Sequence, residues 1–139
     1  MWPVRGSVVR RFVAPACPRC AGHRGVDIAV EAGSPVRTVA AGTITFAGDV
    51  ARRTYVVQRL GSGALVTYGW MASVDPVVTK GAIVGRGMVL GTTGRIFYLG
   101  VRVGGRPVEP LRALGFSAPR LVGPGGVRSA EVGRRGPNR

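Results

Sequence analysis

Four side chains able to bind a metal ion lie close together near the start of the chain. They are Cys17, Cys20, His23 and Asp27, in the spacing Cys-x2-Cys-x2-His-x3-Asp. Thiolate, imidazole and carboxylate are common zinc ligands, and a CxxC pair is a frequent half of a structural zinc site. In a reducing compartment the four predict a closed zinc site, whereas in an oxidising compartment the rival is a short-loop disulfide between the cysteines. Two unligated cysteines in a loop are the third alternative.

His23 is the only histidine of the chain, and it lies four residues before Asp27 where a loop enters an expected strand. A lone histidine is more often structural than catalytic. Hydrolytic zinc sites combine three protein ligands with one open position for water, whose pKa the metal lowers to about 7. These two residues by themselves therefore indicate a metal site only weakly, and their context must decide.

The elements around these residues are expected to be short β-strands. The 139 residues include 23 glycines and 10 prolines, which interrupt helices and suit tight turns. No helical period is visible before residue 110, and one helical turn is expected at Glu109–Leu114. The expected strands are Ser7–Val13, Val26–Val30, Val36–Ala40, Thr43–Ala47, Thr54–Arg59, Ala64–Trp70, Ile83–Val84, Val89–Leu90 and Ile96–Val103. This pattern predicts an all-β fold, a glycine-rich antiparallel sandwich or open barrel with little helix.

The length and composition predict one domain followed by a basic tail. Hydrophobic residues make up 45% of the chain, which is enough for a core. We expect residues 1–114 to form the domain, and residues 115–139, rich in Gly, Pro and Arg, to be extended or disordered. No apolar run is long enough to span a membrane, and we expect a monomer.

The net charge of the chain indicates which kinds of partner it could attract. Twenty lysine and arginine residues against six acids give a net charge of +14, which attracts anionic polymers such as nucleic acid or a cell wall. A solvated basic surface is the simpler interpretation, because aromatic residues are only 6% and none are interleaved with arginine as a stacking platform requires. Binding of nucleic acid through the basic tail stays an alternative.

Several motifs in order resemble one family. They are the Trp-Pro-Val start at residues 2–4, the H-x-G-x-D box at 23–27, the G-x-P-V turn at 33–36 and the G-R-P-V-E-P segment at 105–110. Together they resemble the lysostaphin/LytM-type zinc endopeptidases that cut peptide cross-bridges in peptidoglycan, over roughly Trp2 to Leu114. The resemblance implies a glycine-rich antiparallel β-sandwich with a groove.

The resemblance also implies where the catalytic groups should lie. His23 and Asp27 take the positions of the first two zinc ligands. The third ligand, the second histidine of an H-x-H triplet, falls on Tyr98, and the two catalytic histidines fall on Ile96 and Trp70. Because the chain holds one histidine, these three imidazoles have no replacement elsewhere in it.

These replacements predict a degenerate, catalytically impaired family member with weak or absent zinc. Trp70, Ile96 and Tyr98 would line a substrate groove, and the domain would bind cell-wall peptide or regulate a wall hydrolase. The first alternative is an active zinc endopeptidase with an unusual metal set, in which Tyr98 would have to bind as phenolate although phenol has a pKa of about 10. The second is a basic module that binds nucleic acid or another anionic polymer. The resemblance implies a secreted or wall-associated protein, yet Met1-Trp2-Pro3 opens no secretory signal, so the compartment stays open.

Overall fold

The computed structural model describes residues 2–116, so nearly all of the expected tail at 115–139 lies outside the described residues. The elements in chain order are β1 (Gly6–Arg10), β2 (Gly25–Val30), β3 (Pro35–Arg37), β4 (Gly42–Val50), β5 (Arg53–Leu60), β6 (Leu65–Val74), β7 (Ile83–Val84), β8 (Val89–Val103), β9 (Arg106–Val108) and α1 (Pro110–Ala113). The all-β prediction is confirmed.

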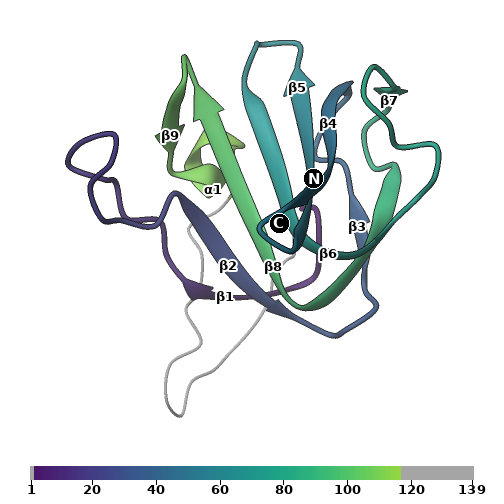
Figure 1. The fold of residues 1–139 in the computed structure, drawn as a ribbon, viewed down its shortest axis with the longest axis horizontal. Coiled ribbons are helices and arrows are strands. Elements are labelled where there is room, and N and C mark those ends of the chain that lie inside the picture. Colours follow the sequence, from purple (N-terminus) through teal and green to yellow (C-terminus); the bar gives the residue numbers. More distant parts are fainter. Residues whose placement is uncertain (1, 117–139) are drawn as a thin grey trace.

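The strands form one open antiparallel sheet around β8. The hydrogen-bonded order is β1-β2-β8-β6-β5-β4-β7, so the sheet ends at β1 and β7 and does not close into a barrel. Strand β6 follows one edge of β8, while β3, β2 and β9 pair in turn with successive parts of its other edge. Figure 1 shows β8 as a long strand through the middle of the molecule.

Strand β8 is continuous where the sequence predicts two short strands, at Val89–Leu90 and Ile96–Val103. Gly91 does not break the ladder, because β3 and β6 both pair with it, and β6 pairs on as far as Thr93 before the register shifts. Gly91 is needed there, since a Cβ atom on it would lie 2.0 Å from the carbonyl oxygen of Ser73. Strand β4 likewise runs on to Val50 through Gly48 and Asp49, which lie beyond the strand expected at Thr43–Ala47.

Side chains along β2 and β8 point alternately into the core and toward the opposite face, where the candidate functional residues lie. Val26 and Ile28 of β2 are buried in the core with Phe97 and Leu99 of β8. Since successive side chains of a strand point to opposite faces, the residues between them face the other side. The core also contains Val4, Val8, Val36, Val39, Ile44, Val56, Val66, Tyr68, Met71, Val78, Val84, Leu90, Val101 and Leu111.

A buried hydrogen-bond chain anchors β6 just before its most irregular point. The Tyr68 hydroxyl donates to Gln58 Oε1 at 2.6 Å and accepts from the backbone N–H of Val39 at 3.0 Å. Gln58 Nε2 donates to the carbonyl of Ala40 at 2.7 Å. Burial raises the pKa of Tyr68 well above its usual range, so the hydroxyl keeps its proton and these buried polar groups stay paired.

The one helix among the described residues confirms the helical turn expected at Glu109–Leu114. The Glu109 carboxylate caps it, accepting from the N–H groups of Leu111 at 3.3 Å and Arg112 at 2.9 Å, and Pro110 occupies its first turn. Just after it, the ring of Phe116 stacks on Trp2 with centroids 4.4 Å apart. No helix in residues 2–116 is long and apolar enough to cross a membrane.

The turn between β4 and β5 offers a test of the hairpin. Ala51 and Arg52 both have left-handed backbone angles, with φ of 51° and 68°, and neither is glycine. We expect Arg52→Gly to raise the free energy of unfolding by about 0.5–1 kcal/mol in urea denaturation, because it removes this strain. Gly104→Ala is the converse variant, because Gly104 has a φ of 58° and an added Cβ atom would meet no other atom there. It should lower stability by a similar amount, and equal stability of both variants with the wild type would contradict the turn geometry.

Candidate functional site

The candidate site lies where β2, β8 and β6 run side by side. The register pairs Tyr98 of β8 with Asp27 of β2 on one side and with Gly69 of β6 on the other. His23 sits just before β2, and its backbone N–H and carbonyl both bond to Val13 at 2.9 Å. The residues assigned to the first, second and third ligand positions are therefore brought together.

His23 and Asp27 face each other directly. Their Nε2 and Oδ1 atoms lie 2.9 Å apart, and the two residues are only 8% and 7% exposed. This is the one ion pair among residues 2–116. Two donor atoms so close and so shielded from water are able to turn toward the same metal ion.

Tyr98 is surrounded by aromatic rings. Its ring centroid lies 5.9 Å from that of His23, 5.7 Å from that of Trp70 and 6.5 Å from that of Tyr55. Trp70 Nε1 donates to the Tyr55 hydroxyl at 3.2 Å, and the Arg53 guanidinium carbon lies 4.0 Å from the centre of the Trp70 ring. We call Tyr55, Trp70 and Tyr98 the aromatic cluster. Offset and edge contacts of this kind stabilise beyond area burial by about 0.5–1.5 kcal/mol each.

Three glycines leave the space that the Tyr98 ring occupies. A Cβ atom would lie 2.6 Å from the Tyr98 Cζ if placed on Gly25, 2.9 Å from its Cδ2 on Gly69, and 3.1 Å from its hydroxyl on Gly100. Glycine inside a strand often marks a close approach of this kind. The ring thus lies across β2, β8 and β6 only because all three strands lack a side chain at these points.

Trp70 stands at an irregular point of β6. The register between β6 and β8 shifts between Gly69 and Met71, so Trp70 is at a β-bulge. Its φ is 62°, a left-handed value that costs a bulky residue energy. The contacts with Tyr55 and Arg53 hold the indole in this conformation.

Ile96, the other residue expected in the groove, is half-buried. It lies two residues before Tyr98 and so on the same face of β8, and it pairs with Ala29 across the β2–β8 ladder. Its branched aliphatic side chain can pack but cannot exchange protons.

The two cysteines form a disulfide in the structure. The loop around it is also held by Arg24, which donates to the carbonyls of Pro18 at 2.7 Å and Cys20 at 3.3 Å. Sulfurs joined to each other are not thiolate ligands, so the alternative zinc set of Cys17, Cys20, His23 and Asp27 is not assembled. No group of three or more His, Cys, Asp or Glu residues that could hold a metal occurs within residues 2–116.

The donors that meet where the resemblance places a metal are too few for a hydrolytic zinc site. His23 and Asp27 supply two ligands, where such a site needs three. Burial raises the pKa of Tyr98, and the nearby Tyr55 raises it further, against the opposing charge of Arg102. The Tyr98 phenol is therefore neutral at pH 7, and a neutral phenol is a poor zinc ligand.

Sequence reasoning missed Tyr55, Arg53 and the role of the glycines. Tyr55 reaches the site because β5 pairs it with Gly69, the residue beside Tyr98. The glycines at 25, 69 and 100 were visible in the strands, but what they accommodate depends on which strand lies next to which.

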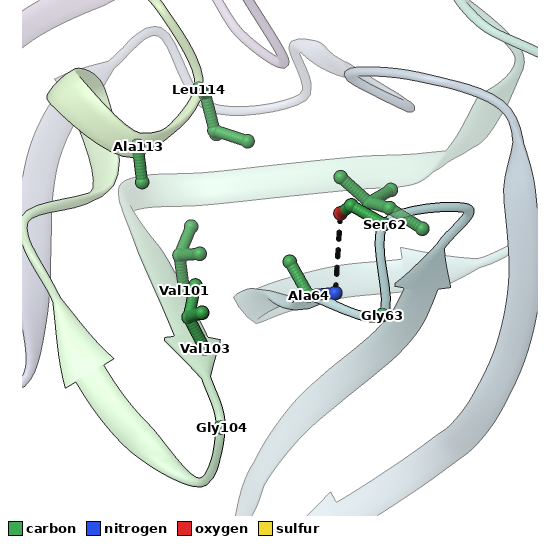
Figure 2. Close-up of a pocket in the computed structure, with 9 residues that line it drawn as sticks. Ser62, Gly63, Ala64, Val101, Val103, Gly104, Ala113 and Leu114 are labelled. Carbon is green, nitrogen blue, oxygen red and sulfur yellow. Dashed lines mark hydrogen bonds between the residues drawn. The ribbon is translucent and has the colours of Figure 1, made fainter.

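A separate pocket of about 420 Å³ lies between the β5–β6 turn, β8 and α1. Its walls are mostly small and aliphatic, as Val101, Ala113 and Leu114 in Figure 2 illustrate, and the one bond drawn there joins the Ala64 N–H to the Ser62 hydroxyl. No titratable side chain lines this pocket, and it offers no catalytic group.

Comparison with known proteins found a family model and several relatives that match this chain. Residues 21–110 match the family model described as Peptidase family M23. An uncharacterized protein of Mycobacterium tuberculosis is 41% identical over 81 residues, which cover 57% of this chain and 30% of that protein. The peptidoglycan DD-endopeptidase ShyA of Vibrio cholerae is 30% identical over 125 residues, covering 81% of this chain and 27% of ShyA. The chain thus spans about a third or less of the length of these relatives.

A solved structure also superposes on this fold. The crystal structure of Csd3 from Helicobacter pylori superposes with a TM-score of 0.70 at 27% identity, covering 79% of this chain and 31% of that one.

The packing of Tyr98 on the glycines predicts a strong penalty at Gly69. A methyl group there would lie 2.9 Å from ring carbons of both Tyr55 and Tyr98. We expect Gly69→Ala to lower the free energy of unfolding by about 1–3 kcal/mol. The penalty should shrink when Tyr98→Ala is added, as a double-mutant cycle in urea would measure. Gly61→Ala, in open space, is the control. An equal penalty with and without the Tyr98 ring would show that the ring does not rest on Gly69.

Proposed function

Because this chain belongs to peptidase family M23, as the match over residues 21–110 shows, we propose that it is a catalytically impaired peptidoglycan endopeptidase-like domain. It binds cell-wall peptide without cutting it, and it is thereby suited to regulate a wall hydrolase. We assign the binding to the domain of residues 1–114, with residues 115–139 as a separate basic tail.

The observation that carries this proposal is the aromatic cluster itself. Two of the three family histidine positions, by resemblance, are taken by Trp70 and Tyr98, whose rings contact each other, and the third by Ile96. The remaining imidazole, His23, is bonded to Asp27. Loss of one general base or oxyanion donor costs about 10²–10⁴ in rate, and two are replaced here.

Zinc is bound weakly or not at all in this proposal. Two donors converge where three are needed, and the Tyr98 phenol keeps its proton because burial raises its pKa. With no third ligand and no second imidazole, we propose no hydrolytic step at this site.

Binding is favoured by the same residues that oppose catalysis. Trp70, Tyr98 and Ile96 are half-buried and thus keep part of their surface accessible. Aromatic faces bind the apolar side of a peptide or sugar with little loss of side-chain entropy, and the surrounding contacts already fix these rings.

The first test compares binding with cleavage on insoluble peptidoglycan. We expect the purified chain to sediment with the wall material and to release no soluble fragments or new amino groups. Trp70→Ala should weaken binding to the wall material by about fivefold or more, since it removes a stacking face worth about 1–3 kcal/mol. Phe46→Ala, which removes an aromatic ring that is 39% exposed on β4, is the matched control and should bind like the wild type.

Two outcomes would overturn the proposal. Chelator-sensitive cleavage that His23→Ala abolishes would establish an active endopeptidase with an unusual metal set. Binding that falls steeply with salt and disappears when residues 117–139 are removed would assign it to the tail and an anionic polymer. The truncation starts after Phe116 because that residue packs on Trp2.

The second test restores the missing ligand. Tyr98 pairs with Asp27 and contacts His23, so we expect an imidazole at position 98 to complete three donors. Tyr98→His should raise zinc affinity by at least about 100-fold in a competition titration with a coloured chelator. Tyr98→Phe, which adds no donor, should leave zinc binding unchanged. A wild-type protein that already binds one zinc as tightly as Tyr98→His would refute the two-donor account.

A further inference from the structure

We propose that Arg53, held over the face of Trp70, recognises a free carboxylate at the end of a peptide, so that the domain binds peptide chain ends. This inference rests on the proposed function and narrows its ligand to a peptide with a free terminal carboxylate and a small apolar last residue.

The first step is the position of Arg53. Its guanidinium carbon lies 4.0 Å from the centre of the Trp70 ring. A cation over an aromatic face is attracted by the ring and restrained there, yet its N–H donors at the edge stay available. Within residues 2–116 the one ion pair is that of His23 and Asp27, so no described carboxylate neutralises Arg53. A planar guanidinium held in one place matches a carboxylate through two parallel hydrogen bonds.

The second step is the charge around the aromatic cluster. Arg53 lies over Trp70, and Asp27 is the acid that β2 pairs with Tyr98. Asp27 is already bonded to His23. The cluster therefore carries one guanidinium with no described carboxylate partner, which favours an anionic ligand.

The third step is the strained backbone of Trp70. A residue this bulky adopts φ 62° at a β-bulge, although a glycine would accept that conformation freely. The core does not require it, because Trp70 is not among the buried core residues and its contacts are with Tyr55, Tyr98 and Arg53. Strain kept at an accessible aromatic residue points to a binding role.

The shape of the arrangement selects the ligand. An indole and a phenol ring beside one restrained guanidinium offer an apolar surface next to a carboxylate-binding group. A terminal residue with a small apolar side chain carries both matching features within one residue. A nucleic acid would instead call for a longer track of cations and stacked rings, which the aromatic cluster does not extend into.

The experiment is an NMR titration of the full chain with N-acetyl-alanyl-alanine and with its C-terminal amide, in both the D,D and L,L forms. The indole N–H of Trp70 and the side-chain N–H of Arg53 report the site. We expect the free acid to shift both signals and to bind at least about tenfold more tightly than the amide, as one charge-assisted pair implies. Arg53→Gln should reduce the affinity for the acid to that for the amide. Arg59→Gln, the same charge change at the exposed far end of β5, should keep the preference.

Each other outcome overturns the inference. Equal binding of acid and amide by the wild type, or an unchanged preference in Arg53→Gln, removes the role of the carboxylate. Full competition by acetate or inorganic phosphate would show a general anion site instead. Sedimentation with peptidoglycan, measured in parallel, separates the two proposals. Wall binding with no preference for the acid leaves the proposed function intact, whereas no wall binding removes both.

Discussion

The arrangement depends on one contact, the Tyr98 ring lying across three strands. The ring occupies space left by Gly25, Gly69 and Gly100, and a side chain on any of them would collide with it or crowd it. The ring thereby packs over the paired strands β2, β8 and β6 at the point where Asp27 and Trp70 enter the site. The position of Tyr98 therefore determines what His23, Asp27 and Trp70 can do together.

Burial of Tyr98 also affects whether its phenol could bind a metal ion. The surroundings that hold the ring in place raise the pKa of its phenol, so the group that we propose at the third ligand position keeps its proton. The core beneath it is unaffected, because Phe97 and Leu99, on either side of Tyr98 in β8, point the other way.

Local patterns predicted much of the fold. Short apolar runs between glycines and prolines indicated most of the strands, and Pro110 after Glu109 indicated the helical turn. The strands that the sequence cut short, β4 and β8, share one cause. Gly48 and Gly91 lay outside the expected strands, yet cross-strand pairing carries β4 through Gly48 and β8 through Gly91. Strand pairing is a non-local stabilisation, and it overrides the local preference of a glycine.

For the site, the sequence by itself determined which chemical groups exist: one imidazole, a carboxylate four residues later, two cysteines, and the aromatic or aliphatic side chains of Trp70, Ile96 and Tyr98. Only the tertiary structure decided how they meet. It paired the cysteines, placed Arg53 on Trp70 and brought Tyr55 to Tyr98. The reason is physical. Side-chain types are a property of the chain, whereas neighbours across a sheet are set by hydrogen-bond register and bulges, and a shift of one residue would turn each side chain to the opposite face.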